Sequence, residues 1–100
     1  AQPQLEVQLA SSGERLPQDG LYEVVVTLTV TAKAGDKTVF LVEAAQAGIF
    51  TISGVPEQDL DPVLGIACPN ILFPYARETI ASTINRAGFP AVNLAPVNFE

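Results

Sequence analysis

A pair of alternating segments between Leu21 and Ile52 constrains the fold of this chain most. In the first segment, Tyr22 and every second residue up to Val30 are apolar, while most residues between them are polar. This period of two is typical of a β-strand with one buried and one exposed face. The sequence Ala34-Gly35-Asp36-Lys37 then supplies a turn that contains glycine. The pattern predicts an antiparallel hairpin.

The second strand of this hairpin, from Val39 to Ile52, has two different faces. Gly48 lacks a Cβ atom, so it predicts a bend or a bulge in the strand. The even-numbered face is mainly apolar and carries Phe40, Val42, Ala44, Gln46, Phe50 and Ile52. The odd-numbered face carries Leu41, Glu43, Ala45 and Ile49.

A third, shorter strand is predicted at the start of the chain. Leu5, Val7 and Leu9 alternate with polar residues, as in a strand with one buried face. Turn-forming residues between Ser11 and Gly20 predict a loop before the hairpin.

Helices are predicted after the hairpin. The segment from Glu57 to Ile66 can form a short helix whose length Pro62 limits. After a loop at Gly65, a longer helix is expected, with Asn70 as N-cap, Pro74 in the first turn and Gly88 at C′. Its apolar stripe comprises Phe73, Ala76, Ile80, Ile84 and Ala87.

These elements predict an α+β fold in one domain that spans residues 1–100. The fold is an antiparallel β-sheet with a helix, capped by the Cys68-Pro69-Asn70 segment, packed on one face. The final segment, from Ala91 to Glu100, is expected to be an ordered loop.

The composition narrows the classes of partner. The net charge of −6 argues against binding to nucleic acid or to anionic membrane surfaces and is compatible with a basic partner. No apolar run is long enough to insert into a membrane as a spanning helix. The hydrophobic fraction of 48% against 16% charged residues suggests an oligomer interface or an apolar binding surface.

The sequence offers little for catalysis. It contains no histidine, so Cys68 cannot form a cysteine–histidine nucleophile pair. A position near a helix start can lower the pKa of a thiol, but without a histidine partner we interpret Cys68 as structural. Glu57, Asp59 and Asp61 are interpreted as a solvated acidic turn rather than a metal site or an acid–base pair. We expect a protein that is not an enzyme and that uses no metal or cofactor.

Several segments resemble the SecB family of bacterial protein-export chaperones. The resemblance extends from about Leu5 to Glu100. Its most distinctive segments are Cys68–Glu78 and Asn93–Phe99, supported by Val39–Glu43 with Gln46–Phe50, and by Leu64-Gly65, Tyr22–Val25 and Gly88–Pro90.

This resemblance implies a SecB-like fold and a cytoplasmic homotetramer, built as a dimer of dimers. Such a chaperone binds unfolded precursor proteins, keeps them competent for translocation and delivers them to the SecA translocation ATPase without a cofactor. The alternatives are a SecB-like oligomeric interaction module with one dedicated partner, and an enzyme of unknown type. Breadth of client binding separates the first alternative from a chaperone, and catalytic turnover would indicate the second.

The resemblance also assigns roles to residues. Leu41 and Glu43 correspond to an acidic platform that docks on SecA, although an exposed leucine and a solvated glutamate need no function. Residues implied at the interface between dimers are Val42, Ala44 and Gln46, and those implied near the client groove are Phe89, Leu94 and Phe99. Relative to the family, the chain is expected to lack the first strand and the last helix.

Overall fold

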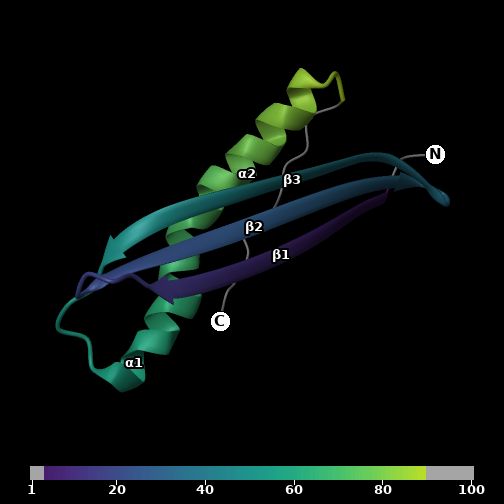
Figure 1. Ribbon diagram of the computed structural model, residues 1–100. Coiled ribbons are helices and arrows are strands. Elements are labelled where there is room, and N and C mark those ends of the chain that lie inside the picture. Colours follow the sequence, from purple (N-terminus) through teal and green to yellow (C-terminus); the bar gives the residue numbers. More distant parts are fainter. Residues whose placement is uncertain (1–3, 90–100) are drawn as a thin grey trace.

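The structure, a computed structural model, describes residues 4–89. It is a three-stranded antiparallel sheet in the order β1-β2-β3, with helical segments packed against one face (Figure 1). The strands are β1 (Gln4–Arg15), β2 (Leu21–Ala34) and β3 (Lys37–Thr51). The helical segments are α1 (Glu57–Pro62), the π-helix η1 (Val63–Ala67) and α2 (Cys68–Arg86). The predicted α+β class and the helix on one face of the sheet are confirmed.

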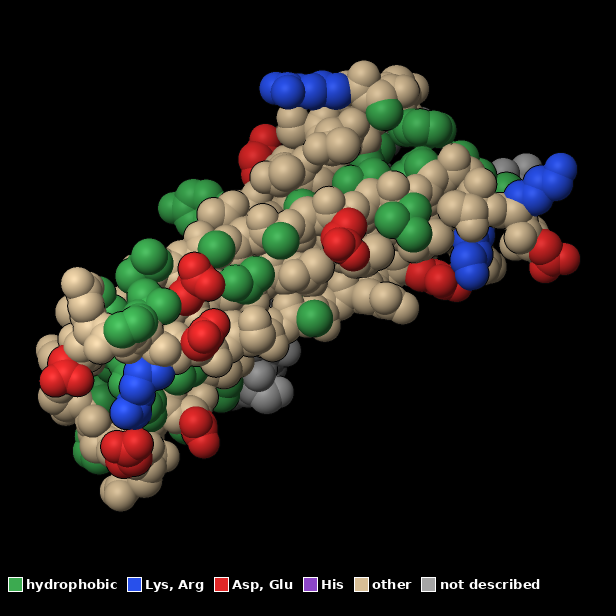
Figure 2. All heavy atoms as spheres, viewed as in Figure 1, with side chains coloured by type: hydrophobic (Ala, Val, Ile, Leu, Met, Phe, Trp, Pro, Cys, Tyr) green, Lys and Arg blue, Asp and Glu red, His purple; other side chains and the backbone are tan. Residues whose placement is uncertain are grey.

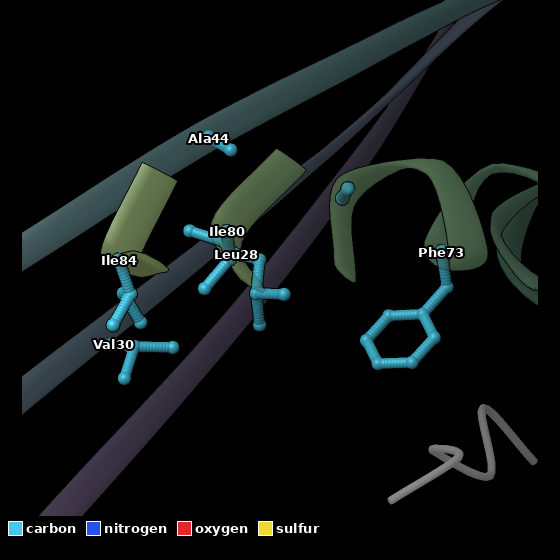
Figure 3. Close-up of a cluster of buried hydrophobic side chains, with 7 residues drawn as sticks. Leu28, Val30, Ala44, Phe73, Ile80 and Ile84 are labelled. Atoms are coloured by element: carbon cyan, nitrogen blue, oxygen red, sulfur yellow. The ribbon is translucent and has the colours of Figure 1, made fainter. Parts of the chain in front are cut away.

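β2 supplies the centre of the core, as its alternation predicted. Its even-numbered residues from Tyr22 to Ala32 are all buried, and the residues between them are half-buried. β2 lies between the other two strands, so hydrogen bonds on both sides hold its register. One buried cluster joins this face of the sheet to α2 and comprises Leu28, Val30, Ala44, Phe73, Ala76, Ile80 and Ile84 (Figure 3).

β1 is longer than predicted. The segment from Ser11 to Arg15, predicted as loop, continues the strand and pairs with β2 as far as Tyr22. Serine and glycine have weak strand propensity, but pairing with a stable neighbouring strand overrides it here. The expected buried face is also incomplete, because Leu9 is half-buried whereas Leu5 and Val7 are exposed.

The hairpin between β2 and β3 turns at Gly35, as predicted, with a positive φ of 63°. The register shifts between Ala32 and Lys33, close to this turn. Gly48 pairs regularly with Val24, so the bulge, one of the two alternatives predicted there, does not form. A Cβ atom on Gly48 would lie 2.8 Å from Leu72 Cδ2, which shows that the glycine permits α2 to approach the sheet closely.

The start of α2 differs from the prediction. There is no loop at Gly65, because η1 connects α1 to α2, and the Cys68 N–H group bonds to the Val63 carbonyl. Ala67, at the N-cap position, has helical torsion angles and no side-chain cap, so the Cys68-Pro69-Asn70 cap does not exist. Asn70 and Pro74 lie inside the helix. A preceding helical turn already bonds the backbone groups that a cap would satisfy.

The end of α2 agrees with the prediction. Gly88, with a φ of 89°, follows the C-cap residue Ala87. The Gly88 N–H group bonds to the Asn85 carbonyl and the Phe89 N–H group to the Ile84 carbonyl, the pattern of a Schellman motif. The predicted apolar stripe is buried except for Ala87, which is exposed because the helix ends there, beyond the core cluster.

Candidate functional site

The face of the sheet opposite α2, which we call the outer face, carries the two residues predicted to form a docking platform. Leu41 and Glu43 both lie on it, and Leu41 is 61% exposed. Glu43 accepts a hydrogen bond from Thr29 Oγ1 at 3.1 Å, and Thr29 lies directly opposite on β2. The strands therefore bring Leu41 and Glu43 to one open surface.

The outer face is acidic. The register of the strands places four glutamates on it, Glu6, Glu14, Glu23 and Glu43. Lys33 shares this face and is paired with Glu6 at 3.5 Å. α2 passes behind the strands in Figure 1, and Figure 2 shows separate acidic side chains between exposed hydrophobic ones on the face toward the viewer. This charge suits a basic partner.

A shallow hollow lies beside Glu43 on the outer face. It has a volume of about 440 Å³ and is open to solvent. Its lining residues are Gln8, Leu9, Ala10, Thr27, Thr29 and Glu43. Ala10 and Thr27 face each other across β1 and β2, and their short side chains leave space between the longer ones.

The predicted interface residues Val42, Ala44 and Gln46 lie on the other face of β3, toward α2. Ala44 is 9% exposed and belongs to the core of its own chain, and Val42 is half-buried against the same cluster. Gln46 is half-buried, and its side chain donates a hydrogen bond to the neighbouring Ala47 carbonyl. Of the three residues, Val42 and Gln46 keep surface that another chain can contact.

Of the three predicted client-binding residues, Phe89 lies within the described part of the chain. Its ring packs on Phe40, with 4.7 Å between the ring centroids. Phe89 is half-buried against the core cluster, so its ring is shared between the core and the surface. Leu94 and Phe99 lie outside the described residues.

The structure exposes apolar residues that the sequence patterns did not predict at the surface. Leu5 and Val7 lie on the α2 side of β1 and are 45% and 47% exposed, because α2 lies mainly over β2 and β3. Ile71 and Tyr75 lie one turn apart on α2 and are 55% and 61% exposed. In the sequence, Ile71 and Tyr75 lie outside the predicted buried stripe of α2, and this position was the signal for a second apolar surface on the helix.

Cys68 and the acidic turn have the structural roles predicted for them. Cys68 is buried in a core cluster with Val24, Val26 and Leu72. Burial raises the pKa of the Cys68 thiol, so the helix start does not activate it. The side chains of Glu57, Asp59 and Asp61 are exposed, and Arg15 lies 3.4 Å from Glu57.

Within residues 4–89 there is neither a side-chain cluster that could bind a metal ion nor a helix that could span a membrane. Histidine, cysteine and acidic side chains in this range do not gather in groups of three or more that could hold a metal ion. None of the helices in the same range combines the length and the apolar character needed to span a membrane.

Comparisons with known proteins agree with this fold. A protein-export protein SecB from Chromobacterium violaceum is 65% identical over 100 residues, which cover 100% of this chain and 66% of the relative. A second, from Methylobacillus flagellatus, is 60% identical over 98 residues, which cover 98% of this chain and 62% of the relative. This chain therefore spans less than two thirds of the length of either relative.

A solved structure and a family model also show similarity to SecB proteins. A SecB-like chaperone from Mycobacterium tuberculosis, in complex with a ChAD peptide from the HigA1 antitoxin, superposes with a TM-score of 0.68 at 16% identity. The match covers 96% of this chain and 73% of that chain, and it confirms the predicted SecB-like fold. The family model described as preprotein translocase subunit SecB matches residues 1–100. This chain belongs to the SecB family.

Proposed function

We propose that this chain is the core of a SecB-type chaperone. It binds unfolded precursor proteins in the cytoplasm, keeps them competent for translocation and delivers them to the SecA translocation ATPase. The observation that carries this proposal is the 65% identity, over the whole chain, to a relative named protein-export protein SecB. The proposed function consists of binding and releasing client proteins, so we propose no catalytic activity and no cofactor.

The proposed assembly is a homotetramer, built as a dimer of dimers. The exposed apolar pairs Leu5 with Val7 and Ile71 with Tyr75 support it, because apolar surface on a small domain favours association. Val42, Ala44 and Gln46 are proposed to contribute from the α2 side of β3, with Val42 and Gln46 making the direct contacts.

The proposed client surface includes Phe89, Leu94 and Phe99, which would bind apolar and aromatic segments without sequence specificity. We expect this binding to be weak and fast-exchanging, because the ring of Phe89 is half-buried against the core and offers only part of its surface to a client. Each 100 Å² of apolar area that a contact leaves exposed costs about 2.5 kcal/mol of binding free energy, before the costs of association are counted.

The chaperone role is tested by diluting an unfolded precursor protein from urea into this chain and measuring light scattering. Suppressed aggregation of several unrelated apolar-rich clients supports the proposal. Binding to one partner and to no other would favour the dedicated interaction module. Full-length C. violaceum SecB is the positive control.

The docking role is tested with Glu43→Lys against purified SecA. We expect an unchanged fold, a slower association rate and a weaker dependence of affinity on salt. An exposed charge acts mainly on the rate at which the two proteins associate. Asp59→Lys is the matched control, since it makes the same change in charge in α1, away from the outer face. Equal affinity of Glu43→Lys and the parent chain at low salt would exclude a platform at this position.

A further inference from the structure

The helical segment that leads into α2 buries little of its own surface. α1 and η1 follow each other without a break, and we call them together the arm, residues 57–67. Within the described chain neither element contributes a buried residue, whereas α2 contributes several. The π-helical form of η1 is rare and occurs mostly as single turns. Helices this short are not stable alone in water, so the arm depends on the contacts that it makes.

Few contacts fasten the arm to the sheet. Leu64 lies over Gly13 of β1, where an added Cβ atom would lie 3.5 Å from Leu64 Cβ. Arg15 Nη2 lies 3.4 Å from Glu57 Oε1, but both side chains are mostly exposed, and such an ion pair contributes little. In Figure 1, α1 lies outside the outline of the sheet. Only a small apolar contact therefore opposes detachment of the arm.

The arm covers a second buried cluster of the core. This cluster comprises Val24, Val26, Cys68 and Leu72. Val63 and Leu64, both half-buried, pack against it from the arm. The cluster that contains Ile80 holds α2 to the sheet separately. Detachment of the arm would therefore uncover the second cluster while α2 stays in place.

Both ends of the arm offer points where the chain can bend. Gly54, between β3 and α1, has a φ of 72°, and no described atom lies within 4 Å of the position of a Cβ atom there. At the other end, η1 passes into α2 and the helix changes from π to α. Hinges are commonly a few residues in loops or at the ends of elements, as at these two points.

We propose that residues 57–67 form a hinged arm that opens as a unit while the three strands and α2 stay folded. Opening breaks the Leu64 contact with Gly13 and uncovers the second cluster together with the Cys68 thiol. The arm therefore controls when this apolar surface meets solvent. This inference goes beyond the proposed function and does not depend on it, because the arm opens whether or not the chain binds precursor proteins.

The proposal is tested by the reaction of Cys68, the one cysteine of the chain, with the aromatic disulfide DTNB at fixed pH. The Cys68 thiolate attacks the disulfide, a mixed disulfide forms, and the coloured thiolate that leaves reports the rate. We expect this rate to rise with urea much less steeply than global unfolding does, because opening the arm exposes little surface. The same steep dependence as global unfolding would overturn the proposal.

Hydrogen exchange gives an independent reading of the same opening. Backbone amides of residues 63–68 should exchange with the opening constant that the labelling of Cys68 gives. Amides of residues 22–32, in the central strand, should exchange more slowly by about tenfold or more. Equal protection of the two sets would overturn a separate opening of the arm.

Variants weaken or strengthen the arm. Glu57→Gln removes the ion pair with Arg15 and should speed labelling of Cys68 about 1.5- to 5-fold. Glu6→Gln is the matched control, because it removes the exposed ion pair with Lys33 on β1 and should leave labelling unchanged. Gly65→Ala favours the helical form of the arm and should slow labelling about two- to fivefold. Equal rates in all three variants would overturn the proposal.

A last pair of variants separates the arm from the whole fold. Leu64→Ala removes the contact with Gly13 and should speed labelling about tenfold. Ile80→Val weakens the other cluster and should lower the ratio of folded to unfolded chain about two- to twelvefold, yet leave labelling in the absence of urea unchanged. If Ile80→Val speeds labelling by the factor that it takes from stability, Cys68 is exposed by global unfolding alone and the arm is overturned.

Discussion

Gly48 illustrates how single residues decide whether α2 can reach the sheet. A Cβ atom at this position would lie 2.8 Å from Leu72 Cδ2 and 3.1 Å from the Phe50 ring. Leu72 is itself buried, at 5% exposure, so it has little room to move away. The glycine is needed here for a close approach between two elements rather than for an unusual torsion angle.

We therefore expect Gly48→Ala to destabilise the protein by about 1–3 kcal/mol, the usual cost of forcing extra volume into a packed core. Gly65→Ala is the matched control, because nothing lies within 4 Å of the position that its new methyl group would take and its helical backbone favours alanine. It should be neutral or stabilising by about 0.5–1 kcal/mol. Urea denaturation measures both, and equal stabilities would contradict the close contact.

Cys68 makes stability depend on pH. Burial raises the pKa of its thiol in the folded state, so the folded protein holds this proton more tightly than the unfolded chain does. The contribution of the protonated thiol to stability is fully present below the ordinary thiol pKa of about 8.5. It is lost as the pH rises through the raised pKa of Cys68 in the folded protein. Below the ordinary value, pH should not change this contribution.

We expect the free energy of unfolding to fall above about pH 8.5, with part of the fall absent in Cys68→Ala. Other groups also titrate at alkaline pH, so the measured quantity is the difference in stability between the parent chain and the variant. That difference should narrow as the pH rises. A constant difference between pH 7 and 10 would show that the thiol titrates alike in the folded and unfolded chains.

Among the strands, β1 contributes least to the core and carries an unfavourable contact. Its residues are exposed except for the half-buried Leu9. Glu14 lies directly opposite Glu23 on β2, and like charges in this arrangement destabilise a strand pair. The C-terminal end of β1, around Glu14, should therefore be the least stable part of the sheet.

We expect Glu14→Lys to stabilise the protein by about 0.2–1 kcal/mol, because it places opposite charges across β1 and β2. The gain should shrink at high salt. Glu6→Lys makes the same charge change on the same strand but loses the 3.5 Å contact with Lys33, so it should not stabilise. Thermal denaturation at two salt concentrations measures both variants, and equal effects would argue against repulsion between Glu14 and Glu23.

The part of the chain that the structure describes is elongated for its size. Its extents are 52 × 24 × 19 Å and its radius of gyration is 16.1 Å, against about 13 Å for a compact domain of 100 residues. An elongated sheet with one helix leaves both sheet edges and much apolar surface uncovered by residues 4–89. Association with further copies would reduce that exposed surface.

We accordingly expect a homo-oligomer, most simply a tetramer, at micromolar concentration. Gln46→Arg should lower the oligomeric fraction, because it places a charge at the edge of the proposed interface. Gln58→Arg, an exposed position in α1, is the control and should leave assembly unchanged. Light scattering over a range of concentrations measures both variants, and a monodisperse monomer of the parent chain would contradict the assembly.

Local patterns in the sequence were sufficient to predict the elements that carry strong periodicity. The alternation of β2, the glycine turn at Gly35 and the apolar stripe of α2 each depend on neighbours in the chain. The C-terminal end of α2 at Gly88 was predictable for the same reason, because its hydrogen bonds close within one turn. The parity of β3 put Leu41 and Glu43 on one face, and the resemblance to the family identified that face as the outer one.

Tertiary structure decided the rest. Pairing with β2 extends β1 through residues that prefer loops, and the helical turn before Cys68 removes the need for the predicted cap. The hydrogen bond from Thr29 to Glu43 joins residues 14 positions apart and depends on the register of β2 and β3. The approach of Leu72 to Gly48 likewise depends on how α2 lies across the sheet. Periodicity reports which face a residue occupies, whereas cross-strand register and helix placement report what that residue meets, and those are set by packing across the whole molecule.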